Sequence, residues 1–340
     1  MFKVEENVSL KSYNTFGIDV NTKYLCRVTT ANQLIDLIQS PVFKQEKHYI
    51  LGGGSNVLFT DDFDGLVIKD DLKGIETVSE TDSHITVKVY AGENWHEFVM
   101  QAVANGWGGI ENLSLIPGTV GAAPMQNIGA YGVEIKNLIE NVEAIELSTG
   151  VLKTFSNEQC AFGYRESVFK RELAKKYFIS SVTLSLSKKN HHLNTTYGAI
   201  QETLKEMNVT QPTIQTVSNA VINIRKSKLP DPVEIGNAGS FFKNPTISLK
   251  QYEELQNLTA TIPGYPTDNQ NVKVPAGWLI EQCGWKGKRI NNVGVHPKQA
   301  LVLVNYGGGN GTEILSLSKK IQAAVWEKFH IMLTPEVNIL

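Results

Sequence analysis

Apolar side chains recur at two different spacings along this chain, so the sequence predicts both helices and strands. Over residues 94–105 they recur at the spacing of a single helix face, and Gly106 follows as a helix terminator. Over residues 85–89 apolar and polar positions alternate, as in a half-buried strand. His96 lies off the apolar stripe of the helix, and we expect it at the surface. The stripe itself should lie in a core, and it consists of Trp95, Phe98, Val99, Ala102 and Val103.

The same two patterns predict further elements. Helices are expected at residues 30–38, from about 195, from about 213, at 278–282 and at 312–328. Strands are expected at residues 48–51, 75–90, 142–147, 151–155, 178–186 and 301–305, with a hairpin turn at 148–150. Ser156 and Gln159 have the spacing of a capping box, which predicts that a short helix begins there.

The clearest domain boundary is Leu229-Pro230-Asp231-Pro232, because two prolines in four residues interrupt a helix. The chain from Val233 to about Lys328 is expected to form a separate α/β lobe. Within it, the glycines at 307–309 join a predicted strand to a long helix, which favours a tight connection over a phosphate site.

A run of three glycines followed by two polar residues, Gly52-Gly53-Gly54-Ser55-Asn56, lies between two short apolar runs. Such a run is entropically unfavourable, so it indicates positive φ angles or close approach of the backbone to another group. A pyrophosphate would suit it, because successive N–H groups can converge on phosphate oxygens. The alternative is a tight strand-to-strand turn. No amphipathic helix follows, which disfavours a Rossmann or Walker loop.

A second stretch, residues 114–132, is rich in glycine and other small residues and carries no charge. It has little bulk to pack against a core, so we interpret it as a backbone surface that lies against a flat ligand. The alternative is a long ordered loop, which in a compact domain is itself usually functional.

Composition restricts the class of protein. The 340 residues are 41% hydrophobic and 19% charged, with a net charge of -2 and a pI near 6.4, which gives no electrostatic footprint for nucleic acid or an anionic membrane. No apolar run is long enough for a membrane span and the N-terminus lacks an apolar signal region, so a soluble cytoplasmic protein is expected. Cys26, Cys160 and Cys283 have neither disulfide-framework nor zinc spacing, and we expect them to be apolar filling residues; no metal is predicted.

Motifs in the same order along nearly the whole chain resemble the UDP-N-acetylenolpyruvoylglucosamine reductase family. The resemblance begins with the glycine turn 52–56 and the loop segments Ile116–Gly121 and Asn127–Gly132. It continues in Asn14–Gly17, Gly163–Ser167, Gly239–Pro245, Ala276–Glu281 and Pro335–Val337. The tyrosines Tyr197 and Tyr265 resemble those of the longer subtype, in which a tyrosine-bearing loop closes over the substrate.

The resemblance implies an α+β fold: a two-lobed FAD-binding domain of the PCMH/vanillyl-alcohol-oxidase-like type and a C-terminal α/β substrate-binding domain. Residues 1–70 would form the first FAD-binding lobe, with a strand in 331–340 returning to it. Residues 71–229 would form the second lobe and 230–330 the substrate-binding domain. The implied reaction is NADPH-dependent reduction of an enolpyruvyl ether on a UDP-sugar, giving UDP-N-acetylmuramate for peptidoglycan synthesis.

Three catalytic residues are carried over from the family's motifs. Arg165 suits the substrate carboxylate, because a guanidinium binds a carboxylate in two places and keeps its charge. Ser240 corresponds to the family's proton donor. Glu336 would stabilise the added charge if it carries a proton, a state that desolvation and a neighbouring carboxylate favour.

The resemblance also implies the binding residues. The cofactor set is Gly52, Gly53, Gly54, Ser55, Asn56, Pro117, Gly118, Thr119, Gly121, Asn127, Gly129 and Arg225. The substrate set is Tyr131, Tyr164, Tyr197, Lys228, Asn244, Tyr265 and Gln299. Because residues 50–68 contain neither histidine nor cysteine, FAD is expected to be bound without a covalent link. NADPH and the sugar are expected to use one site in turn, and the protein is expected to be a monomer.

Two other functions fit parts of the sequence. One is an FAD-dependent oxidase of a small molecule from the same superfamily, which would consume oxygen without NADPH. The other is a nucleotide-sugar or flavin-binding protein without turnover, in which Arg165, Ser240 and Glu336 would have no catalytic role.

Overall fold

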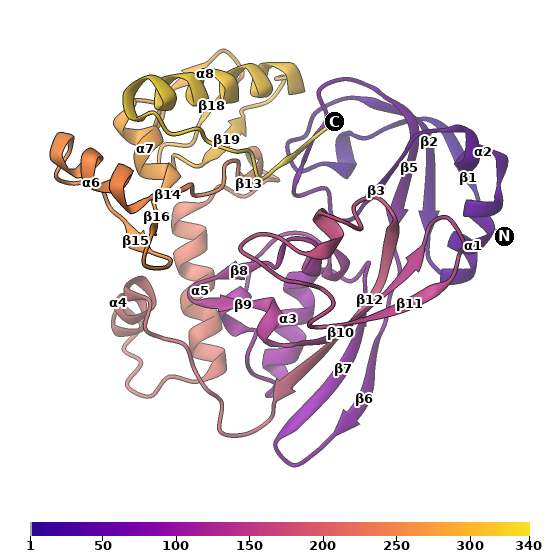
Figure 1. Cartoon of the computed structure of the whole chain (residues 1–340). Helices are drawn as coiled ribbons and strands as arrows, with labels where there is room; N and C mark the ends of the chain where they lie inside the picture. Colours follow the sequence, from indigo (N-terminus) through magenta and orange to yellow (C-terminus); the bar gives the residue numbers. More distant parts are fainter. Residues whose placement is uncertain (1) are drawn as a thin grey trace. The chain divides into compact units, whose positions relative to one another are not determined.

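The computed structural model describes residues 2–340 (Figure 1). Contacts between residues divide the chain into two compact units. Unit 1 comprises Met1–Val8, Thr22–Gly53 and Asp64–Ser227. Unit 2 comprises Ser9–Asn21, Gly54–Phe63 and Lys228–Leu340. Each unit is therefore assembled from segments that are far apart in the sequence. The division into three functional domains at residues 70 and 229 stays a prediction.

The first sheet of unit 1 has four strands in the order β1-β2-β5-β3. They are β1 (Val4–Ser9), β2 (Asn21–Val28), β3 (His48–Leu51) and β5 (Phe63–Asp70). Helix α1 (Ala31–Gln39) begins where the Thr30 hydroxyl accepts a hydrogen bond from the Gln33 N–H, and the short α2 (Pro41–Gln45) follows. The apolar face of α1 is buried in one core with residues of β2 and β5, as its periodicity predicts.

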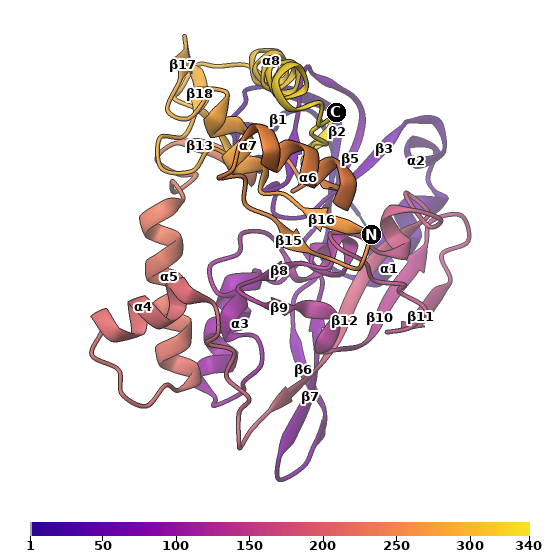
Figure 2. The same ribbon diagram turned by 60° about the vertical axis from the view of Figure 1, so that its left-hand side comes forward.

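The second sheet of unit 1 is antiparallel, with the order β11-β10-β12-β7-β6. Its strands are β6 (Ile75–Glu80), β7 (His84–Tyr90), β10 (Ile139–Glu146), β11 (Leu152–Ser156) and β12 (Tyr177–Ser187). Figures 1 and 2 show the hairpin of β6 and β7 extending beyond the neighbouring strands. The apolar stripe of α3 (Trp95–Ala104) is buried in one core with this sheet, which confirms the predicted helix.

Two further helices of unit 1, α4 (Gly198–Glu206) and α5 (Ile214–Lys228), share a small core. The segment between α3 and β10 forms the 3-10 turns Glu111–Leu113, Val120–Ala122, Pro124–Gln126 and Ile135–Asn137 and the short strands β8 (Gly129–Ala130) and β9 (Val133–Glu134). A further 3-10 turn is Val168–Lys170.

The predicted helix after Ser156 is wrong. Both hydrogen bonds of the capping box form, from the Ser156 N–H to Gln159 Oε1 at 2.9 Å and from the Gln159 N–H to Ser156 Oγ at 3.3 Å. They close a turn instead, because Ala161 has a left-handed φ of 46° that stops a helix from continuing.

The main sheet of unit 2 has the order β13-β19-β18-β17, and α8 covers β18 and β19 (Figure 1). Its strands are β13 (Gly236–Ser240), β17 (Arg289–Ile290), β18 (Val293–Val295) and β19 (Val302–Asn305). A second sheet contains β14 (Thr246–Ser248), β15 (Tyr265–Pro266) and β16 (Asn271–Lys273). The helices are α6 (Leu249–Leu258), α7 (Ala276–Gln282) and α8 (Gly311–Phe329), preceded near the N-terminus by the 3-10 turn Lys11–Tyr13. Strand β20 (Asn338–Ile339) pairs in parallel with β4 (Val57–Leu58).

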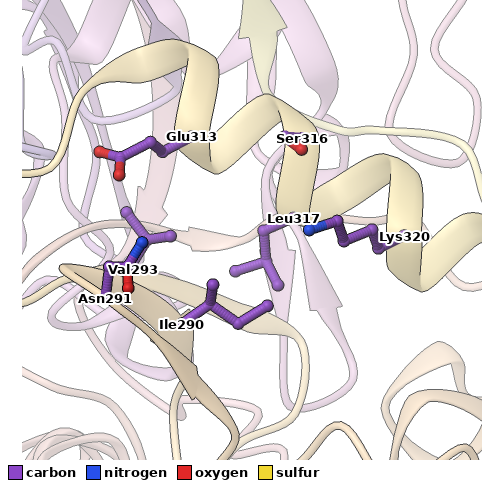
Figure 3. A pocket seen from close by; sticks show the side chains of 7 residues that line it. All are labelled: Ile290, Asn291, Val293, Glu313, Ser316, Leu317 and Lys320. Carbon is purple, nitrogen blue, oxygen red and sulfur yellow. The ribbon is translucent and has the colours of Figure 1, made fainter.

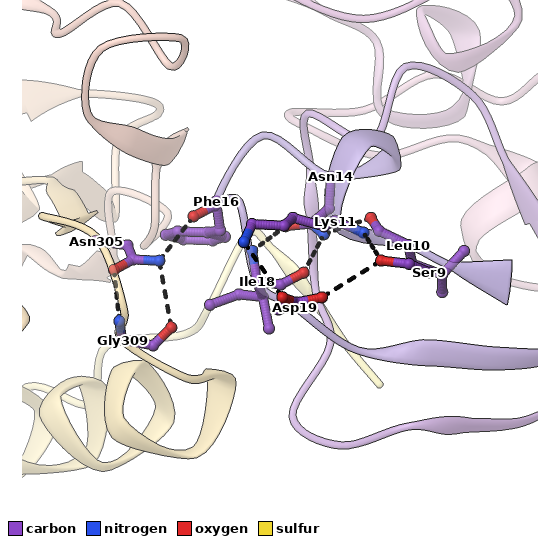
Figure 4. Close-up of polar contacts among 9 residues, drawn as sticks. All are labelled: Ser9, Leu10, Lys11, Asn14, Phe16, Ile18, Asp19, Asn305 and Gly309. Carbon is purple, nitrogen blue, oxygen red and sulfur yellow. Dashed lines mark hydrogen bonds and ion pairs between the residues drawn. The ribbon is translucent and has the colours of Figure 1, made fainter.

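Two asparagines organise the early segment Ser9–Asn21 of unit 2 (Figure 4): Asn14 fixes its internal shape, and Asn305 connects it to the main body. The Asn14 amide donates to the carbonyls of Leu10 at 2.8 Å and Ile18 at 2.9 Å, and its oxygen accepts from the Ile18 N–H at 3.0 Å. The Asn305 amide donates to Phe16 O at 2.9 Å, and its oxygen accepts from the N–H groups of Gly307 and Gly309, both at 3.0 Å. The glycines at 307–309 therefore form the predicted tight connection.

In the part of the chain from residue 2 onward, no helix combines the length and apolar character that crossing a bilayer requires.

Candidate functional site

Two glycine-rich segments of unit 1 lie against each other. A Cβ atom on Gly53 would lie 2.8 Å from the Cα atom of Gly118, and one on Gly52 would lie 2.6 Å from Oγ1 of Thr119. Glycine is therefore required at position 53 by close packing of two backbones, and at position 52 by the close approach of the Thr119 side chain.

We call the four residues Gly52, Gly53, Gly118 and Thr119 the glycine cradle. The hydroxyl of Thr119 is its polar side-chain group. It is buried, and among residues 2–340 it has no hydrogen-bond partner. Buried hydroxyls are nearly always hydrogen-bonded, so one that faces glycine backbone indicates a ligand atom as its partner. A phosphate oxygen is suitable, and the residues of this cradle therefore fit the diphosphate of a dinucleotide cofactor.

The third glycine has a different role. Gly54 belongs to unit 2 and has a φ of 64°, and a Cβ atom there would overlap the carbonyl oxygen of Tyr13. The backbone of Asn56 is also engaged, since its carbonyl accepts from the Asn338 N–H at 3.1 Å. Residues 54–56 therefore make backbone contacts within unit 2, whereas Gly52 and Gly53 belong to unit 1. The sequence Gly-Gly-Gly does not reveal that its glycines have different partners.

Two further cofactor candidates, Gly121 and Asn127, belong to the glycine-rich segment 114–132. A Cβ atom on Gly121 would lie 2.5 Å from that of Ala91. The Asn127 amide is fully used by the protein: it donates to Glu134 Oε2 at 3.1 Å and Gly163 O at 3.0 Å, and its oxygen accepts from the Lys136 N–H at 3.1 Å. Its side chain therefore fixes the shape of the loop.

His96 was expected at the surface, and this expectation is wrong. The residue is half-buried on α3, and its Nδ1 atom accepts a hydrogen bond from the Leu115 N–H at 3.0 Å. Helical periodicity places it off the apolar stripe correctly, but the segment after Leu113 covers that side of the helix. Nothing in the local sequence indicates this contact.

Arg165 lies in a tight turn of unit 1 and has a left-handed φ of 56°. Mutual backbone hydrogen bonds of Gly163 and Glu166, at 3.0 and 3.3 Å, close the turn. The Nη2 atom of Arg165 donates to the carbonyl of Gly129 at 2.8 Å, and its Cζ lies 5.9 Å from the centre of the exposed Tyr164 ring. The turn and this bond together set the direction of the guanidinium.

A second arginine of unit 1, Arg225, comes from α5 and donates through Nε to the carbonyl of Leu115 at 3.1 Å. Burial lowers the pKa of Arg225, Tyr131 opposes this, and the charge of Arg165 lowers it further. Two guanidiniums that repel each other across one region favour an anionic ligand there.

Two tyrosines of the predicted substrate set are in contact. The rings of Tyr131 and Tyr197 pack edge to face with centroids 5.3 Å apart, and Tyr197 is exposed at the N-terminus of α4. Asn112, which the sequence did not single out, is fully buried and donates to the carbonyls of Tyr131 at 3.1 Å and Asn194 at 2.8 Å. It therefore fixes the backbone from which Tyr131 extends.

The chain segments that carry Ser240 and Glu336 lie side by side within unit 2. Ser240 is exposed at the end of β13, after Gly239 with a φ of 67°. The Glu336 N–H donates to the carbonyl of Phe241 at 2.8 Å, and Asn56 Nδ2 donates to the Glu336 carbonyl at 3.4 Å. The chain segments that carry the serine hydroxyl and the carboxyl are thus neighbours, although they are far apart in the sequence.

The other substrate candidates of unit 2 divide into two groups. Asn244 accepts from the Ala276 N–H at 2.9 Å, and the Gln299 Oε1 lies 3.2 Å from the position of a Cβ on Gly277, so both flank the start of α7. Lys228, at the end of α5, and Tyr265, on β15, lie on separate elements, and both are exposed.

A pocket of about 160 Å³ in unit 2 lies elsewhere, between α8 and the β17–β18 hairpin (Figure 3). Glu313 and Lys320 lie on its rim, but no predicted site residue lines it. Glu313 already caps α8 with Asn310. We assign this pocket no role in the chemistry.

The family follows from comparison with known proteins. Residues 231–340 match the family model for UDP-N-acetylenolpyruvoylglucosamine reductase, C-terminal domain, and residues 22–156 match the FAD binding domain model. A UDP-N-acetylenolpyruvoylglucosamine reductase of Flavobacterium johnsoniae is 50% identical over 338 residues, covering 99% of this chain and 100% of the relative. This chain belongs to the UDP-N-acetylenolpyruvoylglucosamine reductase family.

Other relatives agree with this assignment. The reductase of Bacteroides fragilis is 45% identical over 337 residues, covering 99% of this chain and 100% of the relative. The crystal structure of the Thermus caldophilus reductase has a TM-score of 0.70 at 24% identity and covers 100% of this chain and 99% of its own, which shows a shared fold. The expected fold class is confirmed, and the chain is an FAD-dependent oxidoreductase.

Proposed function

We propose that this reductase acts on the enolpyruvyl group of UDP-N-acetylglucosamine enolpyruvate and forms UDP-N-acetylmuramate for peptidoglycan synthesis, with Arg165, Ser240 and Glu336 as its catalytic residues. The observation that supports the catalytic assignment is the hydrogen bond from the Glu336 N–H to Phe241 O, because it brings the backbone next to Ser240 alongside the backbone of Glu336. Cytoplasmic location, a monomeric state and the three-domain division are parts of the same proposal.

The chemistry determines what the protein must supply. FAD, when bound, supplies hydride for the substrate double bond after reduction by NADPH. Addition at the terminal carbon moves negative charge onto the inner carbon and the carboxylate, which is unfavourable unless donors already point at those atoms.

Arg165 would bind the substrate carboxylate. A guanidinium can bind a carboxylate in two places, and the bond to Gly129 O holds this one in one direction before substrate arrives. Donors oriented in advance need no reorganisation during the reaction, so the assignment fits the need to stabilise developing charge. Arg225 would add positive charge on the side of the cofactor.

Ser240 would donate the proton to the inner carbon. A serine hydroxyl is a weak acid, so it acts only on a strongly basic carbanion held within hydrogen-bond distance. An exposed position suits this role, because solvent can return the proton afterwards. Glu336, on the neighbouring segment, would stabilise the added charge as a hydrogen-bond donor.

The binding residues have supporting roles. Gly52, Gly53, Gly118 and Thr119 would hold the FAD diphosphate by the fit described above. Lys228 would supply charge for the diphosphate of the UDP-sugar, with Tyr131, Tyr164, Tyr197, Asn244, Tyr265 and Gln299 as further substrate contacts.

Stopped-flow absorbance in the flavin band tests this proposal, because reduction by NADPH and oxidation by the sugar are measured separately. Ser240→Ala should leave bleaching by NADPH nearly unchanged and slow the return of colour on sugar addition roughly hundredfold to ten-thousandfold, because only the second step needs the proton. Ser316→Ala, an exposed serine of α8, is the matched control.

Equal slowing of both steps in Ser240→Ala would remove its assignment as the proton donor. NADPH oxidation that does not depend on the sugar would contradict the proposed substrate. Oxygen uptake without NADPH would favour the oxidase alternative. Flavin binding without oxidation of NADPH or reduction of the sugar would favour the alternative of a binding protein without turnover.

A further inference from the structure

The loop that precedes Thr119 contains one strained residue. Leu115 has a φ of 59°, in the left-handed region that a leucine occupies only when its surroundings hold it there. Ile116, Pro117, Gly118 and Thr119 follow directly, so the direction of the Leu115 peptide units sets the path of the segment that forms the glycine cradle.

Side chains from two helices fix Leu115. His96 of α3 accepts from its N–H at 3.0 Å, and Arg225 of α5 donates to its carbonyl at 3.1 Å. Neighbouring contacts come from the same helices: the Trp95 N–H donates to Gly118 O at 3.0 Å, and the Ser114 and Ser218 hydroxyls lie 2.8 Å apart. The loop is therefore held from both sides at a residue that would otherwise relax.

The bond to His96 requires a particular ring state. Nδ1 accepts a hydrogen bond only when it carries no proton, so the ring is neutral with its proton on Nε2. Protonation of Nδ1 would point its N–H at the Leu115 N–H and would add a positive charge near Arg225. The charged groups around this ring are Arg225 and Lys226 of α5 and Glu97 of α3. Burial and the two cations lower the pKa of His96, and Glu97 opposes them.

We propose that neutral His96 is a positioning residue for FAD binding: by accepting from Leu115 it holds the loop 115–119 in the shape that receives the cofactor, and protonation of the ring weakens binding. A ligand binds less tightly when its site must first be ordered, because that ordering reduces the net binding free energy. The inference rests on the proposal that Gly118 and Thr119 contact FAD.

The test is a fluorescence titration of the full-length apoprotein with FAD from pH 5 to pH 8. His96→Leu removes the acceptor and should weaken FAD binding roughly tenfold or more at pH 8, because the Leu115 N–H is left without its partner. His96→Asn places an amide oxygen near the former Nδ1 position and should recover most of the affinity. His192→Leu, an exposed histidine in unit 1, is the matched control and should bind as the wild type does.

The pH profile separates positioning by a neutral ring from a packing role. Wild-type affinity should fall at a pH below the ordinary histidine range, since the pKa of His96 is lowered, and His96→Asn should lack that fall. Equal losses in the Leu and Asn variants, or the same acid fall in the Asn variant as in the wild type, would overturn the inference. Wild-type binding by His96→Leu at every pH would do the same.

Gly53→Ala distinguishes this inference from the cofactor assignment, because its Cβ would press on Gly118. If Gly53→Ala binds FAD as tightly as the wild type, the assignment of the cradle is wrong. If Gly53→Ala loses FAD while the His96 variants keep it, the cradle stands and the role of His96 is wrong. Far-UV circular dichroism of each variant verifies that the fold is retained.

Discussion

The buried carboxyl of Asp70, in the interior of unit 1, should make the stability of the protein depend on pH. It ends β5 with 4% of its surface exposed, and its Oδ1 accepts from the Leu72 N–H at 3.1 Å. Burial raises the pKa of Asp70 to about 7, although the Leu72 N–H and the charge of Lys69 act in the opposite direction. We expect Asp70→Asn to stabilise the protein at neutral and alkaline pH.

The size of the effect follows from proton linkage. In the unfolded chain Asp70 ionises near its ordinary pKa of 3.8, whereas in the folded protein it keeps its proton until about pH 7. Between these values the folded state binds more protons, so stability falls as the pH rises through this window and is constant above it. A gap of about 3 pH units at about 1.4 kcal/mol per unit gives at most about 4 kcal/mol.

An asparagine resembles the neutral acid in shape and never ionises. Asp70→Asn should therefore match the wild type near pH 4 and exceed its free energy of unfolding by up to about 4 kcal/mol near pH 8. Urea unfolding of the FAD-saturated protein, followed by far-UV circular dichroism from pH 4 to pH 8, measures the difference. A difference that is the same at all pH values would refute the argument.

The adjacent Asp71 is a matched control of opposite sign. Burial opposes its ionisation, but hydrogen bonds from Lys69 Nζ at 2.9 Å and Arg27 Nε at 2.7 Å outweigh burial and lower the pKa of Asp71. Its stabilising contribution is present above its unfolded pKa and is lost as the pH falls through its folded pKa. Asp71→Asn should thus be less stable than the wild type at pH 8, and the difference should shrink in acid.

Four other substitutions test separate parts of the structure. Gly17→Ala and Gly54→Ala introduce a Cβ at the same φ of 64°, but only at Gly54 does it overlap the Tyr13 carbonyl; we expect a loss of about 1–2 kcal/mol at Gly17 and a clearly larger one at Gly54, measured by urea unfolding. Asn14→Ala removes three buried hydrogen bonds and should lower the free energy of unfolding by about 3 kcal/mol, with no change in the flavin spectrum. Arg165→Lys loses the planar two-point contact and should raise KM for the sugar roughly tenfold in steady-state assays, whereas an unchanged KM would argue against carboxylate binding.

Local patterns in the sequence predicted most of the α-helices but fewer than half of the strands. The apolar stripes of α3 and α5 and the long helix α8 follow from spacing alone, because a helix face is formed by residues three and four positions apart. The turns at 52–56 and 307–309 follow from glycine, which marks special backbone geometry wherever it is clustered. The motif resemblance identified the family and the candidate site residues. Neither can be predicted from the spacing of apolar residues.

Tertiary structure decided which partners those residues have. Gly53 meets Gly118 while Gly54 meets Tyr13, so adjacent glycines in one run serve different units. His96 was expected to face solvent and instead holds Leu115. These contacts join segments that are far apart along the chain. The identity of a residue does not reveal which distant residue it will contact.

Interactions among near neighbours therefore determine most of the α-helices and the tight glycine turns, and the local sequence is enough to predict them. Other features depend on how distant segments pack, and packing is a property of the complete folded molecule. They are the division into two units, the burial of Asp70, and the contact between the segments that carry Ser240 and Glu336. The environment that shifts a pKa or directs a side chain exists only after those segments meet.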